Sequence, residues 1–392
     1  MPSADKPSSA LPFVSFRRPI LTMRGGNVHA LALSRDCDPQ NSEMESFQRQ
    51  VLAQFHSLAV ATNDEFLSLS WIRKLLDAFA SCQELFREIL SNNKGKVSKP
   101  PVDKFVLEYF DRTIKALDIC NATRDGIEKI RQWKKHLDIV VAAMDCHQKM
   151  IGEGNIRRAK KALTDLALFM LDDKGTGSVF SHRNRSFGRA QKNKERQNSR
   201  GSGHSRSLSW SVPNSWSASK QLQTMANNLV IPRANELAAA NSLSNVVFTM
   251  SFILMFVLWT LVAAFPCQDR GHQVHFTIPR QFVWSTPFFL LHSRITDESK
   301  KRGWRDSNGF LREINRIEKS IHHMTDLVDS VQVPLAEEQK EEVRESVKEL
   351  AIVCEICNSE LDPLERNLRD VFRKIMSCRT EGLQILGKST QP

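Results

Sequence analysis

Breakers of helical structure are scarce in this 392-residue chain, which has only 16 glycines and 15 prolines. Both residues fall below their average share, and no pair of alternating segments is joined by hairpin-turn residues. Tyrosine is almost missing too, with Tyr109 as the single example. These absences exclude β-rich architectures, so we predict an all-α fold: a helical bundle with a central, fully apolar helix and a long disordered basic linker.

Patterns that mark common catalytic sites are also missing. The sequence has no glycine-rich phosphate loop, no nucleophile-elbow pattern, no H-E-x-x-H and no EF-hand loop. Its carboxylates lie among lysines and arginines on expected solvated helix faces, as in Glu337 to Glu349. We therefore expect no enzyme, no cofactor and no catalytic residue.

No secretory signal opens the chain, because its first residues hold scattered Pro and Arg and no apolar run long enough for an h-region. Its eight cysteines are spread along the sequence, mostly on apolar faces of expected helices. This distribution is typical of reduced, buried thiols. We expect a protein of the cytosol that associates with membranes and is not secreted.

The net charge of +11 is concentrated in one segment. Between Lys174 and Lys220 there are ten Lys or Arg and one acid, Glu195, which gives +9 and leaves about +2 for all other residues. Such a segment fits an anionic lipid or protein surface. Aromatic residues for base stacking are few there, so no nucleic-acid partner is expected.

Serines near arginines in this segment suggest regulation. The candidates follow an arginine at a spacing that basophilic kinases favour, and each phosphate would add about −1.5 to −2, cancelling the positive charge. The alternative is an unregulated, solvated linker. The candidate phosphorylation sites are Ser186, Ser199, Ser207 and Ser209.

The most distinctive stretch runs from Val246 to Phe265, twenty residues without a charge. At about 1.5 Å per residue, such a helix would be roughly 30 Å long, which matches the hydrocarbon core of a bilayer. A helix that is apolar all round also occurs at the centre of a large bundle. Both interpretations, a single membrane span and a bundle core, stay open, and they use the same residues: Val246, Phe252, Leu254, Phe256, Leu258, Trp259, Leu261 and Phe265.

Helical periodicity continues on both sides of this stretch. Before it, capping boxes at Ser42 and Thr62 open two helices, Pro100-Pro101 restarts a third, a break is expected at 121–126, and Asn155 caps a further helix whose apolar face includes Phe169. After it, an apolar segment with Trp284 and Phe288 directed inward leads to three amphipathic helices, the last begun by Asp362-Pro363. The expected organisation is a disordered tail (1–40), an N-terminal helical bundle (41–171), a basic Ser-rich linker (172–220), an apolar-helix region (221–268) and a C-terminal helical region (269–392).

Metal ligands have little support. Cys354-Glu-Ile-Cys357 is a lone pair of thiols without the second pair that a zinc site needs, and on a helix the two are neighbours one turn apart. His272 and His275 lack an acidic or thiol partner at a fixed spacing, and His322 and His323 point to different helix faces. We expect no metal.

Three runs of sequence are similar to a known family. They are ANELAAANSLSNVVFTMSFILMFVLWTLVAAFPCQDRGHQVHFTIPRQFVW (234–284), LDPLERNLRDVFRKIMSCRTEGLQILGK (361–388) and WKKHLDIVVAAMDCHQKMIGEGNIRRAKKALTDL (133–166), together with MPS...SFRR at the start. In these runs the chain resembles the plant BYPASS and ROH families of helical proteins, most closely the ROH branch. The linker is not part of the resemblance.

The resemblance implies a non-enzymatic regulatory adaptor that binds a subunit of the exocyst and modulates polarised secretion, such as cell-wall or mucilage deposition. The sister BYPASS branch implies an alternative, a developmental regulator that limits a mobile root-derived signal. Family members are often labelled single-pass membrane proteins because of the apolar segment. No catalytic residues are known for the family, so none is carried over.

Overall fold

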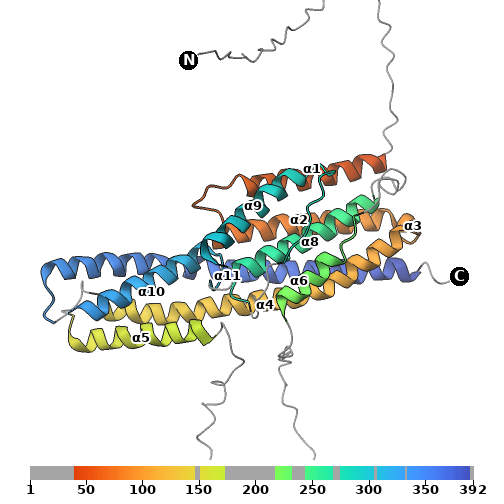
Figure 1. Ribbon diagram of the computed structural model, residues 1–392. Helices are drawn as coiled ribbons and strands as arrows, with labels where there is room; N and C mark the ends of the chain where they lie inside the picture. Colours follow the sequence, from red (N-terminus) through yellow and green to blue (C-terminus); the bar gives the residue numbers. More distant parts are fainter. Residues whose placement is uncertain are drawn as a thin grey trace, which may run out of the picture. The chain divides into compact units, whose positions relative to one another are not determined.

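Helices account for every regular element in the part of the chain that the structure describes (Figure 1). This structure is a computed structural model, and it describes residues 39–145, 151–172, 217–231, 243–267, 274–303, 307–331 and 333–388. The all-α prediction is confirmed for these residues. The helices are α1 (Pro39–Ala59), α2 (Leu69–Asn92), α3 (Lys94–Val97), α4 (Val102–Met144), α5 (Glu153–Asp172), α6 (Ala218–Asn227), α8 (Leu243–Ala264), α9 (Ser285–Arg302), α10 (Arg312–Ser330) and α11 (Glu337–Lys388).

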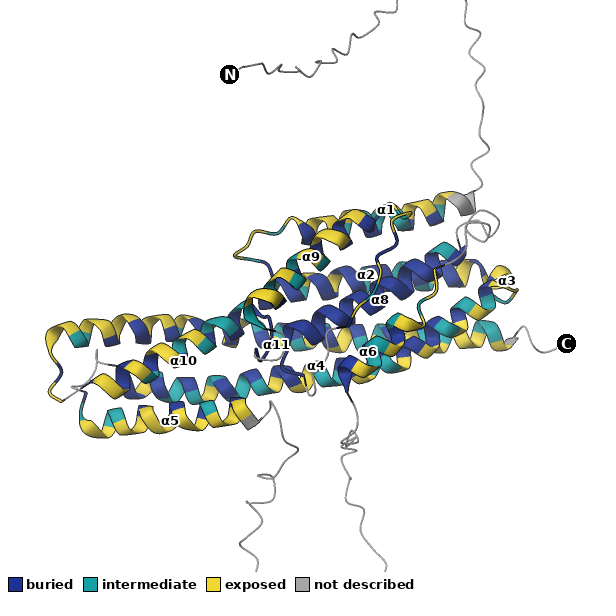
Figure 2. Ribbon diagram, in the orientation of Figure 1, coloured by how far each residue is buried: buried dark blue, intermediate teal, exposed yellow. Residues whose placement is uncertain are grey.

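The apolar helix α8 lies at the centre of the packing. Helices α1, α2, α4 and α6 surround it, and all of its 22 residues except Asn245 are buried. Figure 2 shows α8 almost entirely in the colour of buried residues. Among the described residues, α8 is the one helix long and apolar enough to cross a membrane, and its apolar window is wholly enclosed by protein. Its neighbours turn their apolar sides inward and their polar sides outward, which is the arrangement of a bundle core.

The end of α8 is capped from a distance. The backbone N–H groups of Phe310 and Leu311 donate to the carbonyls of Ala263 and Ala264, at 3.0 and 3.3 Å. These carbonyls belong to the last turn of the helix, where backbone carbonyls lack the intrahelical N–H partners of the helix interior. Gly309 has a φ of 152°, and an added Cβ would lie 2.3 Å from the Ala264 oxygen. The close approach of the two backbones therefore requires glycine at this position.

Helix α4 continues through the break expected at 121–126. Thr123 satisfies its hydroxyl within the helix by donating to the Ile119 carbonyl at 2.9 Å. Gly126 faces the end of α8, where an added Cβ would lie 3.2 Å from the Cβ of Phe265. The prediction of a break was wrong because this glycine serves a close helix contact, and it does not interrupt the hydrogen-bond ladder.

Helix α11 is likewise a single helix where the sequence predicts two. Pro363 lies inside it. A proline costs the helix one hydrogen bond, but residues on both sides of Pro363 are fixed to the same neighbouring helix, α2. Arg73 and Arg87 of α2 pair with Glu360 and Glu381 at 2.9 Å each. This packing outweighs the local preference for a helix boundary.

The pairing of residues also gives the directions of the three longest neighbours. Arg73 of α2 pairs with Glu360 of α11, and the later Arg87 pairs with the later Glu381, so these two helices run parallel. Contacts from α4 to α11 run in opposite order, from Arg379 on the Phe110 carbonyl to Arg131 on Glu365. The segments before and after the basic segment thus form one packed unit, Pro39–Pro392.

Three further helix boundaries differ from the sequence prediction. Helix α1 begins at Pro39, three residues before the expected cap Ser42. Thr62 does accept from the Glu65 N–H at 3.3 Å, but it closes a turn, and α2 begins only at Leu69. Ser68 caps that helix, and both carboxylate oxygens of the distant Glu313 accept from the Leu69 N–H. Helix α5 begins two residues before the expected cap Asn155.

Side-chain directions were mostly predicted correctly on either side of α8. Trp284 and Phe288 are fully buried, as expected, although the segment is helical from Ser285 onward. Phe169 is different, because 40% of it is exposed and it does not belong to the buried face of α5.

Candidate functional site

The residues of the apolar stretch form an aromatic core. Rings of Phe252 and Phe256 pack against Trp284 and Phe288 of the following segment, with centroids 4.8 to 5.2 Å apart. Trp259 stacks on His292 at 5.1 Å. Burial, and then the neighbouring His275, lower the pKa of His292, which keeps its ring neutral at physiological pH. The eight residues that the sequence indicates for a membrane or core helix are all buried, with at most 2% of each exposed. They are Val246, Phe252, Leu254, Phe256, Leu258, Trp259, Leu261 and Phe265.

A small polar network crosses this core. The amide of Gln48 donates to the Thr249 hydroxyl at 3.1 Å, and the Trp284 indole donates to the Gln48 oxygen at 2.7 Å. The network fixes α1, α8 and the start of α9 in one register, because each buried polar atom needs its partner. The sequence does not identify Gln48, which has no periodic or motif signal of its own. It also lines a groove of about 410 Å³ at the surface.

The four candidate phosphorylation sites, Ser186, Ser199, Ser207 and Ser209, lie outside the described residues. His272 lies outside them as well.

Cys354 and Cys357 are buried on α11, where burial raises the pKa of each thiol to about 12. His322 and His323 are exposed, and His323 bonds to Ser346 at 2.8 Å. Among the described residues, no group of His, Cys, Asp and Glu side chains could hold a metal ion.

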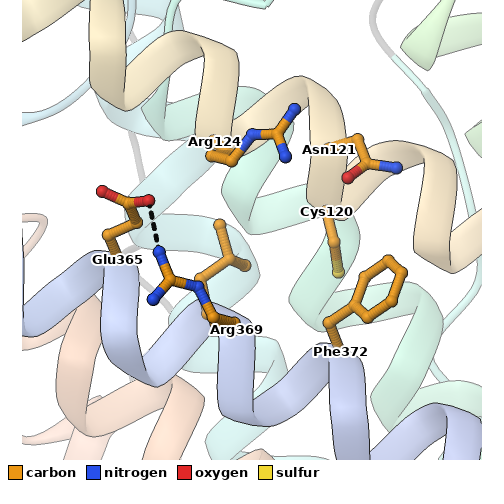
Figure 3. A pocket seen from close by; sticks show the side chains of 7 residues that line it. Cys120, Asn121, Arg124, Glu365, Arg369 and Phe372 are labelled. Carbon is orange, nitrogen blue, oxygen red and sulfur yellow. Dashed lines mark hydrogen bonds and ion pairs between the residues drawn. The ribbon is translucent and has the colours of Figure 1, made fainter. Parts of the chain in front are cut away.

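A crevice between α4 and α11 is a candidate site (Figure 3). Its floor is apolar, and two arginines, Arg124 from α4 and Arg369 from α11, stand at its rim (Figure 3). Its volume is about 190 Å³, below the several hundred Å³ typical of small-molecule pockets. Its size suits a single protein side chain. The lining residues are Cys120, Asn121, Arg124, Glu365, Leu368, Arg369 and Phe372.

The titratable side chains that line the crevice are Cys120 and Glu365 together with two arginines, and their protonation states favour binding over catalysis. Burial raises the pKa of the Cys120 thiol to about 12, so it is protonated and is a poor nucleophile. Glu365 is shared by two guanidinium groups, accepting from Arg131 at 2.7 Å and from Arg369 at 2.8 Å. Desolvation alone would raise the pKa of Glu365, but these hydrogen bonds and charges outweigh it and lower the pKa below its usual range. The carboxylate of Glu365 is therefore ionised, and both of its oxygens already accept hydrogen bonds from arginines.

The shared carboxylate predicts a pH-dependent stability. A glutamate whose pKa is lowered by folding stabilises the folded state above its ordinary pKa of about 4.3, and this contribution is lost as the pH falls through the lowered pKa. Arg131→Gln is expected to reduce the free energy of unfolding by about 1 kcal/mol at neutral pH. The difference from the unsubstituted chain should shrink as the pH falls below about 4. Urea unfolding at a series of pH values measures it.

A matched control is available on α11. Arg373 is exposed and pairs with Asp370 of the same helix at 3.1 Å, so Arg373→Gln should change stability little at any pH. A cost of Arg131→Gln that is the same at acidic and neutral pH would contradict the role given to Glu365.

A family model and two relatives match nearly the whole chain. The family model described as Protein ROH1-like matches residues 1–386. Protein ROH1D of Arabidopsis thaliana is 49% identical over 95% of this chain and 97% of its own length. Protein ROH1A of the same plant is 34% identical over 91% of this chain and 93% of its own. UPF0496 protein 4 of Oryza sativa subsp. indica is 18% identical over 71% of this chain and 53% of its own. No solved structure matches significantly.

Proposed function

This chain belongs to the ROH1-like family, and from this premise we propose that it is a non-enzymatic adaptor that binds an exocyst subunit and modulates polarised secretion. The observation that carries the proposal is the match along nearly the entire chain to ROH proteins, since the resemblance to that branch implies the exocyst contact. The fold suits an adaptor, because its apolar helix is buried and its long helices offer polar outer faces.

The crevice between α4 and α11 is the contact surface that we assign to this partner. Protein interfaces gain most of their affinity from a few anchors, often an arginine or an aromatic residue beside a desolvated pocket. Here Phe372 and Leu368 form an apolar hollow, and Arg124 and Arg369 supply positive charge at its edge. A matching partner presents one apolar or aromatic side chain next to an acidic residue.

The interface predicts the effect of one charge reversal. Arg124 is exposed and pairs weakly with the neighbouring Asp125 at 3.3 Å, so the fold does not depend on it. Arg124→Glu is expected to weaken binding of the exocyst subunit about tenfold or more, because it places a negative charge opposite the acidic residue of the partner. Biolayer interferometry of the full chain against each purified exocyst subunit measures this.

Arg373→Glu serves as the matched control, since Arg373 is an exposed arginine of α11, the other helix of the crevice, but does not line the crevice; the affinity of this variant should stay unchanged. If the Arg124→Glu and unsubstituted chains bind the exocyst subunit equally well, the crevice is not the contact surface. If the unsubstituted chain binds no exocyst subunit, the adaptor function itself is wrong. Normal secretion with altered levels of a mobile signal in a loss-of-function plant would then support the BYPASS-type alternative.

A further inference from the structure

The outermost ridge of α5 has an unusual composition. Helix α5 packs on α4 and α10, and its buried face consists of Ala159, Ala162, Leu163, Leu166 and Met170. The positions directly opposite recur at spacings of four and three residues, which places them on one line along the helix. They are Arg157, Lys161, Thr164, Leu168 and Leu171, and all are exposed. Figure 2 shows that much of α5 is exposed.

This ridge changes chemistry along its length. Its first half is basic, since Arg157, Arg158, Lys160 and Lys161 are all exposed within five residues. Its second half is apolar: Leu168 and Leu171 are each 60% exposed, and Phe169 beside them is 40% exposed. Three large apolar side chains within four residues, all open to solvent, are costly unless another surface covers them.

We propose that this ridge of α5 docks on an anionic membrane surface, with its basic half on the lipid headgroups and its apolar half inserted at the headgroup–acyl boundary. A helix lying in the plane of a membrane combines these two chemistries, because cationic side chains are attracted to anionic lipid and apolar ones leave water. From residue 157 to residue 171 the ridge spans about 21 Å, so both halves meet the same surface.

A planar lipid surface fits this ridge better than an acidic protein does. The ridge residues line none of the described pockets at α4, α1 or α10, whereas protein hot spots are held in pockets. Lys160 is paired with Asp329 of α10 at 2.6 Å, which leaves the other three basic side chains of the cluster for the headgroups. The strongly basic segment of the sequence begins at Lys174, two residues after α5 ends, and would add to the same attraction.

Flotation of the purified full chain with vesicles tests the proposal. The probes are phosphatidylcholine vesicles with and without about 20% phosphatidylserine. Leu168→Ser/Leu171→Ser and Arg157→Gln/Lys161→Gln should each lower partitioning onto the anionic vesicles about tenfold, and the charge variant should also show a weaker salt dependence. The matched control is Leu107→Ser/Ile114→Ser, which removes from α4 two apolar side chains that are 45% and 49% exposed. It should partition as the unsubstituted chain does.

All substituted positions are exposed, and unchanged thermal midpoints would show that each variant folds. Unchanged vesicle binding by both ridge variants would overturn the proposal and assign lipid binding to the basic segment. Loss of exocyst-subunit binding without loss of vesicle binding would also overturn it, because the ridge would then contact a protein. No protein partner is present in the vesicle assay, so its failure leaves the proposed exocyst contact untouched.

Discussion

Gly309→Ala is expected to destabilise the folded chain by about 3 kcal/mol. At a φ of 152°, an L side chain is strained before it meets any neighbour. The new Cβ would lie 2.3 Å from the Ala264 oxygen and 2.9 Å from Ile314 Cδ1. The Ala264 oxygen is backbone at the end of the buried helix α8, so relief requires the capping segment to move away. The hydrogen bonds from Phe310 and Leu311 to α8 would then weaken.

Chemical denaturation of the purified variant measures this cost. Gly154→Ala is the control, because it lies in α5 and no atom lies within 4 Å of its added Cβ. It should be as stable as the unsubstituted chain or slightly more stable, since alanine favours a helix more than glycine does. If the two variants prove equally stable, the 309–311 backbone does not hold the end of α8.

Local sequence signals predicted the elements that depend on local physics. The charge-free stretch from Val246 to Phe265 indicates an apolar helix whether lipid or protein surrounds it, and the structure has that helix at 243–264. The first of the three amphipathic helices expected in the C-terminal region is likewise observed, as α10. Hydrophobic periodicity suffices in such cases, because the residues that form the element also determine its buried side.

Predictions failed where a distant residue decides the local structure. Gly126 and Pro363 are ordinary helix breakers in sequence, but each lies inside a helix held by packing on another element. The start of α2 depends on Glu313, which no local pattern connects with Leu69.

The candidate site follows the same rule. Arg124 and Arg369 lie far apart in the sequence, and the antiparallel contact of α4 with α11 alone brings them to one crevice. The apolar end of α5 was misassigned for a related reason: periodicity gives the buried face as a broad stripe, and Phe169 lies just beyond its edge.

Phe256→Ala is expected to cost about 3 to 5 kcal/mol of folding free energy, because it removes a fully buried ring from the core. The ring of Phe256 packs edge-on against Phe288 at 4.8 Å and lies 5.6 Å from Trp259. Denaturant unfolding in detergent-free buffer, followed by tryptophan fluorescence and circular dichroism, measures the cost. Phe289→Ala is the matched control, since it removes the same ring from a position that is 39% exposed; its cost should be below about 1 kcal/mol.

The same pair of variants decides between the two interpretations of the apolar helix. In a membrane span, lipid would surround Phe256, and its loss would hardly affect the rest of the chain. A span would also separate α2 and α4 from α11 by a bilayer, which is incompatible with the pairing of Arg87 with Glu381 and of Arg131 with Glu365. We therefore expect terminal tags at both ends to be open to protease in cells, with the chain released from membranes by alkaline carbonate. A chain that stays in the membrane pellet with its C-terminal tag protected would contradict the bundle. Membrane contact would then belong to α8, and the outer ridge of α5 would lose its assigned role.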